Sequence, residues 1–262
     1  MLLTRVLSAL ILLPIVIGLI WIGGWWFYGL LAILLSIAAF EFEQLMQLGG
    51  FQPPLFFSIV LILVLLTSTA APQIDLLQPA IAFALIGSLT WQLGHRQTVP
   101  TVNWALAVAI GLYLGAAGAH IILQRQLDHG ERWLLLTLTG TWLADSGAYF
   151  VGIRWGRHKI TPTLSPKKSW EGFIGGTLFS SLLNPIVASL LSLPVIHGAA
   201  LGLIGATIGL LGDLSISMIK RQVGAKDSGD IIPGHGGVLD RLDSLLFTVM
   251  VGYYYIIWIA LA

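Results

Sequence analysis

The sequence contains no cysteine and few charges. Cysteine is absent from all 262 residues, which excludes disulfide bonds and thiolate metal sites. Only 10% of the residues are charged and 56% are hydrophobic, whereas soluble domains carry about 25% charged residues. A soluble fold of this length cannot hide so much apolar surface, because its interior volume is limited. The composition therefore predicts an integral membrane protein, with lipid as the solvent for its apolar side chains.

Long hydrophobic runs divide the chain into candidate membrane spans. A transmembrane helix needs about 20 mostly apolar residues, and these runs are continuous rather than alternating, which disfavours strands. The breaks at Gly23-Gly24 and Pro194 are short, so eight spans is the alternative count. We predict an all-α, polytopic helical bundle that packs as a single domain over 1–262. The nine predicted spans are roughly 6–22, 25–46, 55–71, 77–94, 103–124, 133–153, 171–193, 196–219 and 244–261.

The basic residues are unevenly distributed over the two sides that these spans define. When the loops are assigned alternately to two sides, eleven of the thirteen Lys and Arg residues fall on one side, and only Arg125 and Arg132 fall on the other. Cytoplasmic loops collect Lys and Arg. The N-terminus and the polar loops 154–170 and 220–243 are therefore predicted to face the cytoplasm, and we expect a bacterial-type inner (plasma) membrane.

Two of these predicted spans contain an acidic residue whose presence in a membrane helix needs an explanation: Asp145 and Asp213. A charged group at the bilayer centre costs about 2.5–3.5 kcal/mol on insertion scales, so a helix–helix hydrogen bond or a position nearer the interface is the structural alternative. Asp213, Ser217 and Lys220 share one helical face. Such a stripe can hold a cation at one end and phosphate oxygens at the other. The alternative is packing for Ser217 and topological anchoring for Lys220 and Arg221.

The segment 217–243 concentrates four basic residues, four acidic residues and one histidine in an otherwise apolar chain. Gly236 and Gly237 can bring backbone N–H groups close to an anion, and the helix that follows points its positive end at the same place. Asp240 and Asp243 lie one turn apart on that helix. Paired carboxylates suit Mg²⁺, which also binds substrate phosphates. The alternative is that both acids only favour a helix N-terminus and that the loop is solvated.

The loop 154–170 is rich in basic residues, including the pair Lys167-Lys168. A basic cytoplasmic loop most often directs topology or contacts anionic lipid. The residues 165–172 predict a turn that enters a helix, with Ser169 as its N-cap. Binding of a triphosphate by the lysine pair is the functional alternative, and the composition favours neither.

The segment 217–243 resembles the signature of the phosphatidate cytidylyltransferases (CDP-diacylglycerol synthases). It matches that pattern throughout, from Ser217 and Lys220-Arg221 to the His-Gly-Gly turn and the closing Asp-Arg-apolar-Asp. The segments 145–150 and 165–172 are also similar to the family. The detailed resemblance covers the C-terminal half, whereas in the N-terminal half only the hydrophobic pattern agrees.

The resemblance implies a membrane nucleotidyltransferase of phospholipid biosynthesis, in which CTP and phosphatidate give CDP-diacylglycerol and diphosphate. It implies Mg²⁺ as cofactor, with room for a second cation, and membrane lipid as partner. No nucleic acid is expected, and a homodimer is left open. The implied catalytic residues are Asp213, Ser217, Lys220, Arg221, Lys226, Asp240, Arg241 and Asp243. Three of them, Asp213, Asp240 and Asp243, are the expected metal ligands. The implied substrate-binding residues are Asp145, Lys167, Lys168, His235, Gly236 and Gly237, and His235 is either catalytic or only shapes the turn.

Three other functions fit the sequence less well. A CTP-dependent lipid-alcohol kinase would transfer the γ-phosphate, and the full signature argues against it. A CDP-alcohol phosphotransferase would carry a DG-x-x-AR motif, which is absent. A transporter that uses Asp145 and Asp213 as ion sites would have polar residues near the midplane and broken helices in both halves of the chain. Here the polar residues gather in one half and at one surface.

Overall fold

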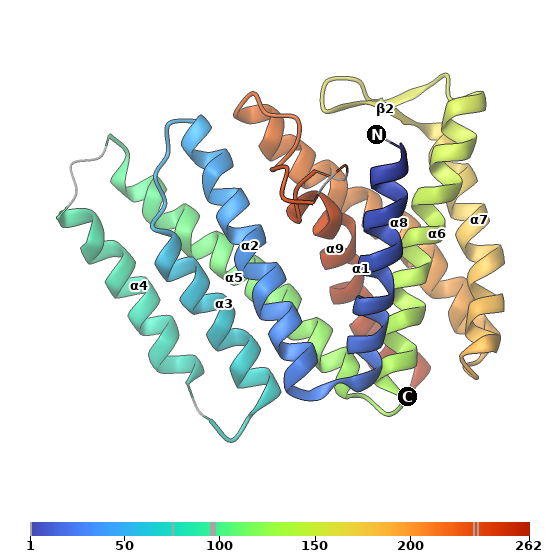
Figure 1. Cartoon of the computed structure of the whole chain (residues 1–262), viewed down its shortest axis with the longest axis horizontal. Coiled ribbons are helices and arrows are strands. Elements are labelled where there is room, and N and C mark those ends of the chain that lie inside the picture. The colour runs from blue at the N-terminus through green and yellow to red at the C-terminus, as the bar shows by residue number, and fades with distance from the viewer. Residues whose placement is uncertain (1, 75, 95–97, 233, 235) are drawn as a thin grey trace. The chain divides into compact units, whose positions relative to one another are not determined.

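The computed structural model describes residues 2–74, 76–94, 98–232, 234 and 236–262, with side chains from residue 10 onward. The described chain is mostly helical (Figure 1). In the described part of the chain, nine α-helices lie at the nine predicted ranges, which confirms the all-α class. Their bounds are α1 (Leu2–Ile22), α2 (Gly24–Leu48), α3 (Leu55–Ala70), α4 (Leu77–Leu93), α5 (Pro100–Gln126), α6 (Gly130–Trp155), α7 (Trp170–Leu190), α8 (Val195–Gln222) and α9 (Leu239–Tyr255), and a π-helical turn follows at Ile256–Ala260.

The length and hydropathy of the helices suit a lipid environment. Among the residues that the structure describes, five helices are long and apolar enough to cross a membrane: α2, α5, α7, α8, and α9 together with the π-helical turn. The helices α3 and α4, and the part of α1 from Leu10, are apolar but shorter. Large apolar side chains such as Trp26 (73% exposed) and Leu190 (80% exposed) point outward, as expected where the solvent is lipid. The chain is therefore an integral membrane protein with a helical fold.

The chain divides into two compact units. Unit 1 comprises residues 1–123 and 222–241, and unit 2 comprises residues 124–221 and 242–262. The signature segment is thereby divided, because Asp240 belongs to unit 1 and Asp243 to unit 2, although both lie on α9.

Close helix packing in unit 1 depends on small residues. Gly111, Gly115 and Gly118 follow one another along one face of α5. A Cβ atom at Gly115 would lie 2.6 Å from the side chain of Leu65 on α3, and one at Gly111 would lie 2.8 Å from that of Leu61. Glycine is required at these positions because small residues let membrane helices approach closely.

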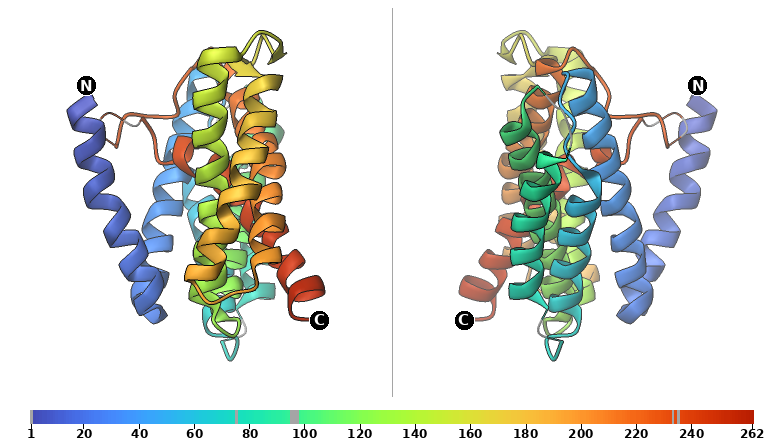
Figure 2. Two further views of the ribbon diagram at one scale, coloured as in Figure 1. Left: turned by 90° about the vertical axis from the view of Figure 1, so that its right-hand side faces the viewer. Right: turned by 90° about the vertical axis from the view of Figure 1, so that its left-hand side faces the viewer.

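In unit 2, α6 and α7 pack side by side (Figures 1 and 2). A Cβ atom at Gly176 of α7 would lie 2.5 Å from the carbonyl oxygen of Ala144 on α6. The buried Asn184 of α7 joins three helices. Its Nδ2 atom donates to the carbonyl oxygens of Leu136 and Gly198, each at 3.1 Å, and its Oδ1 atom accepts from Thr139 Oγ1 at 2.9 Å. Buried polar groups satisfied in this way hold α6, α7 and α8 in register.

A short antiparallel hairpin precedes α7, formed by β1 (Lys159–Thr161) and β2 (Ser165–Ser169). The sequence predicted only a turn here, and the two paired strands were not predicted. Ser169 ends β2 and caps α7, and its Oγ atom accepts from the backbone N–H of Gly172 at 3.2 Å. The predicted N-cap is thus confirmed, and the hairpin leads directly into α7.

Candidate functional site

Asp213 lies at the centre of a group of charged and hydroxyl side chains in unit 2, which we call the Asp213 cluster: Lys168, Asp213, Ser217, Lys220 and Asp243. The stripe on α8 has the predicted helical order. Ser217 Oγ donates to Asp213 Oδ1 at 3.0 Å, so these two residues share one face of the helix. Ser217 and Lys220 are each only 7% exposed. The stripe therefore lies largely inside the protein.

The β1–β2 hairpin brings a basic residue to this stripe. Lys168 Nζ lies 2.5 Å from Asp213 Oδ2, and both side chains are partly exposed, at 23% and 29%. At the end of α8, Arg221 Nε donates to the carbonyl oxygen of Leu164 at 3.1 Å, which ties the hairpin to the same helix. Of the two lysines predicted to bind substrate, Lys168 is in the cluster, while Lys167 is exposed on β2.

Asp243 joins the cluster from α9. Its side chain is 7% exposed, and its Oδ1 atom accepts from the backbone N–H of Ser244 at 2.7 Å. The carboxylate is repelled by Asp213 and attracted by Lys220 and Lys168. The helices can approach this closely because a Cβ atom at residue 212 would collide with the carbonyl oxygen of Asp243, and that residue is glycine. Two carboxylates and two ammonium groups are thus held together in unit 2.

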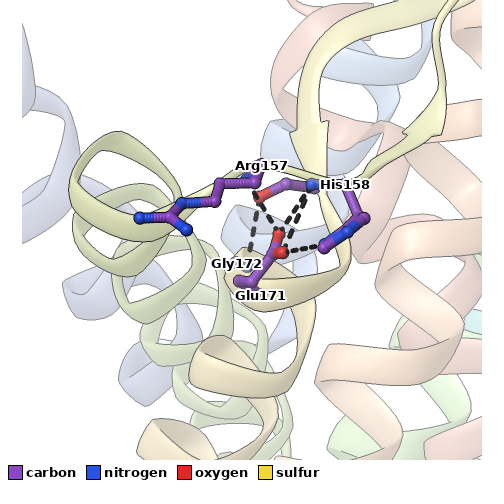
Figure 3. Close-up of polar contacts among 5 residues, drawn as sticks. Arg157, His158, Glu171 and Gly172 are labelled. Carbon is purple, nitrogen blue, oxygen red and sulfur yellow. Dashed lines mark hydrogen bonds and ion pairs between the residues drawn. The ribbon is translucent and has the colours of Figure 1, made fainter.

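A carboxylate at the start of α7 holds the base of the hairpin (Figure 3). Glu171 accepts from the backbone N–H groups of Arg157 and His158, at 3.1 and 3.2 Å, and His158 Nδ1 lies 2.5 Å from Glu171 Oε1. An acidic residue in the first turn also complements the positive end of the helix dipole. Glu171 and Ser169 therefore fix the two ends of the hairpin against α7, which limits where Lys168 can lie.

The turn before α9 belongs to unit 1 and is organised by Asp240. Its Oδ2 atom accepts from the backbone N–H groups of Ser228 at 2.8 Å and Gly237 at 3.2 Å. Gly236 has a φ of +83°, a conformation that favours glycine. A Cβ atom at Gly237 would collide with Ser228 Oγ. Glycine is thus favoured at 236 by its backbone conformation and at 237 by the close approach of a side chain.

One polar residue of this region was missed by the sequence analysis. Glu41 of α2 has no exposed surface, and its carboxylate accepts from Ser228 Oγ at 3.0 Å, Val238 N at 2.9 Å and Leu239 N at 2.8 Å. The signal was available, because an acidic residue within the predicted span 25–46 carries the same insertion cost as Asp145 and Asp213. In this structure, the anion at the N-terminus of α9 is the Glu41 carboxylate.

Three further predicted residues are exposed. Lys226 and Arg241 are exposed in unit 1, and Asp145 is exposed on α6 in unit 2. His235 lies outside the described residues, so its predicted role in the turn stays a prediction.

Whether the Asp213 cluster can bind a divalent cation depends on the carboxylates of Asp213 and Asp243. Among the residues whose side chains the structure describes, no group of three or more His, Asp or Glu side chains is arranged to hold a metal ion. Asp213 and Asp243 nevertheless supply hard oxygen atoms within one cluster, and this donor set fits Mg²⁺, which needs only one or two carboxylates when phosphates and water complete its shell. A shared cation between Asp213, Asp240 and Asp243 stays a prediction.

Comparison with known proteins establishes the family. A model of the cytidylyltransferase family matches residues 3–259, almost the whole chain. The chain belongs to the cytidylyltransferase family. The family predicted from the segment 217–243 is thereby confirmed, and the protein is a nucleotidyltransferase.

This cytidylyltransferase is similar to proteins named phosphatidate cytidylyltransferase in several bacteria. It is 33% identical to the one from Synechocystis sp. over an alignment of 285 residues, gaps included, and this alignment covers 97% of this chain and 96% of the relative. It is 33% identical to the one from Bacillus subtilis over 260 residues, covering 96% and 95%. The one from Thermotoga maritima is 46% identical over 133 residues, covering 48% and 49%.

Proposed function

We propose that this protein is a phosphatidate cytidylyltransferase, which converts CTP and phosphatidate to CDP-diacylglycerol and diphosphate. The observation that carries the proposal is the Asp213 cluster, where Lys168 and Lys220 lie beside Asp213 and Asp243. Such a mixture suits a reaction between two phosphate groups, because cations are needed to let anions meet and carboxylates are needed to recruit and orient those cations. The names of full-length relatives support phosphatidate as the lipid substrate.

In the proposed reaction, a phosphate oxygen of phosphatidate attacks the α-phosphorus of CTP. The new bond joins that oxygen to the α-phosphorus, the bond from the α-phosphorus to the bridging oxygen of the β-phosphate breaks, and diphosphate leaves with the electron pair. The attacking oxygen is already anionic near neutral pH, so no strong general base is required. The obstacle is the repulsion between the two substrates.

The side chains of the cluster address this repulsion. The ammonium groups of Lys168 and Lys220 provide fixed positive charge next to the reacting phosphates, and the hairpin and α8 hold them in place before substrate binds. Preorganised charge of this kind needs no reorganisation during the reaction. Asp213 orients Lys168 through the 2.5 Å ion pair and orients Ser217 through its hydrogen bond. Positioning of both substrates supplies much of the remaining rate enhancement.

Mg²⁺ is proposed as cofactor, held by Asp213 and Asp243, with Asp240 as the further ligand that the sequence predicts. When bound, it would neutralise charge on the phosphate oxygens. The residues of this chain would position it through the two carboxylates of the cluster, and a second cation is compatible with the same proposal.

The site is proposed to face the cytoplasm of a bacterial-type inner membrane. The uneven distribution of Lys and Arg supports this orientation. CTP would then arrive from water, while the acyl chains of phosphatidate remain among the exposed apolar side chains of the helices.

The test is a transfer assay with purified protein in detergent, phosphatidate, Mg²⁺, and CTP labelled at either the α- or the γ-phosphate. The proposal expects α-label in the lipid product and γ-label only in diphosphate. Incorporation of γ-label alone would instead identify a lipid kinase, and no incorporation from either nucleotide would contradict the proposal.

A further inference from the structure

Glu41 lies on α2, far from the signature segment in sequence, yet it contacts that segment in unit 1. We infer that Glu41 is a positioning residue for this cytidylyltransferase: it fixes Ser228, Val238 and Leu239, which are close in sequence to Lys226 and Asp240, and thereby positions those two residues. The inference rests on the proposed function, because Asp240 is there a further ligand of the Mg²⁺ that acts on the CTP phosphates, and Lys226 is one of the catalytic residues that the resemblance implies.

Both carboxylate oxygens of Glu41 are used. Oε1 accepts from Val238 N at 2.9 Å, and Oε2 accepts from Leu239 N at 2.8 Å and from Ser228 Oγ at 3.0 Å. The first N–H groups of a helix have no partner within it, and Leu239 is the first residue of α9. Glu41 therefore satisfies donors at a helix N-terminus, where a negative charge is also favoured by the helix dipole.

The backbone at Gly229 and Gly237 lies close against this carboxylate. A Cβ atom at Gly229 would lie 2.9 Å from Glu41 Oε1, and one at Gly237 would lie 2.5 Å from Glu41 Oε2. The signature glycine at 237 is thus explained by close approach to a carboxylate of the same chain. Since Glu41 is fully buried, the carboxylate acts as a permanent internal anchor.

Ser228 connects Glu41 to Asp240, a predicted catalytic residue. Its hydroxyl donates to Glu41, while its backbone N–H donates to Asp240 Oδ2. Release of Ser228 from Glu41 would loosen the hydrogen bond that orients Asp240. It would also free the residues that precede α9, and Asp243 lies one turn beyond Asp240 on the same helix.

The chemistry of the contact requires a carboxylate. Glutamine has nearly the same shape but only one acceptor oxygen, so its NH₂ group would face either the N–H of Val238 or that of Leu239. A buried donor that faces another donor leaves both unsatisfied. Glu41→Gln is therefore a conservative change in volume that removes the anchor.

The matched control is Glu43→Gln on the same helix. Glu43 is half-buried, and its described hydrogen bond is to Gln47 within α2, at 3.1 Å. We expect Glu41→Gln to lower kcat/KM for CTP about 100-fold, the effect of misplacing a positioned group, with a higher KM for CTP and a nearly unchanged KM for phosphatidate. Glu43→Gln should match the wild type.

A merely structural role would give a different pattern. Loss of folded protein would lower kcat in proportion and leave both KM values unchanged, and that result would overturn the inference. If Glu41→Gln does not fold, Ser228→Ala removes one hydrogen bond of the anchor and should raise KM for CTP in the same direction, by a smaller factor. Wild-type CTP kinetics in Ser228→Ala would then overturn it.

Hydrogen exchange of the segment 228–239 in detergent separates this inference from the proposed function. Faster exchange in Glu41→Gln than in Glu43→Gln is expected whatever the reaction is. If the wild type transfers no cytidylyl group, the proposed function fails even when exchange changes as expected. If the wild type is active and Glu41→Gln matches Glu43→Gln in kinetics and exchange, the positioning role fails alone.

Discussion

Lys168 Nζ lies 2.5 Å from Asp213 Oδ2, and this ion pair joins the β1–β2 hairpin to the first residue of the polar stripe on α8. The hydroxyl of Ser217 donates to the other oxygen of the same carboxylate. Asp213 thus orients a cation and a hydroxyl at once. Because both charged side chains are partly exposed, the pair contributes little to stability, and its value lies in placing an ammonium group beside the carboxylates.

Removal of Lys168 should therefore impair catalysis more than folding. Lys168→Ala is expected to lower kcat by about 10²- to 10³-fold, the range seen when one preorganised electrostatic group is lost from an active site. Lys159→Ala is the control, since Lys159 is exposed on the same hairpin. Steady-state transfer from α-labelled CTP measures both variants, and equal activities would exclude a specific role for Lys168.

The two carboxylates of the Asp213 cluster predict a dependence on Mg²⁺. A chelator should abolish transfer, and added Mg²⁺ should restore it. Asp243→Asn should raise the Mg²⁺ concentration needed for half-maximal rate, because it removes one of the two carboxylates that can hold the cation. A Mg²⁺ titration of the wild type and the variant measures this shift, and superimposable titrations would remove Asp243 from the proposed metal site.

Close approach of α8 and α9 predicts a strong effect of one methyl group. In Gly212→Ala the added Cβ atom would collide with the carbonyl oxygen of Asp243, so the helices must move apart and both stability and activity should fall. Overpacking of this kind costs about 1–3 kcal/mol. Gly29→Ala is the control, because a Cβ atom there would have no neighbour within 4 Å. Thermal unfolding in detergent should show a lower Tm for Gly212→Ala alone.

The contacts at the base of the β1–β2 hairpin can be tested without an assay of enzymatic activity. Glu171→Ala removes the acceptor for the N–H groups of Arg157 and His158 and should loosen the hairpin. Trypsin should then cleave after Lys159 or Lys167 faster than in the wild type, and activity should fall less than in Lys168→Ala. An unchanged cleavage rate would mean that Ser169 and Arg221 hold the hairpin without Glu171.

Much of the helical fold was predictable because it depends on local properties. Continuous apolar runs located all nine helices, and their ends differ from the predicted ranges by only a few residues. The hydrogen bond from Ser217 to Asp213 was also predictable, since residues four apart share a helix face. The N-cap at Ser169 follows from the preference of serine for that position. The signature predicted the family because it is a dense pattern of fixed residues.

Contacts between distant segments could not be predicted in this way. The sequence placed Lys168 in a basic loop with two equally good interpretations, and only the folded hairpin assigned it to Asp213. Glu41 carried a signal of its own, a charge within an apolar span, but nothing in the pattern named its partners. Periodicity describes which residues share a face of one helix, and it contains no information on which face of another element will pack there.

By itself, the sequence determined the solvent, the helices and the chemistry of this protein: lipid by composition, nine helices by the length of apolar runs, and cytidylyl transfer by its polar signature. The tertiary structure decided which carboxylates hold which parts of the chain, with Asp213 paired to a hairpin lysine and Glu41 buried beneath the turn before α9. The reason is physical. Local preferences are set by neighbours along the chain, whereas a buried charge is stable only where folding brings donors to it.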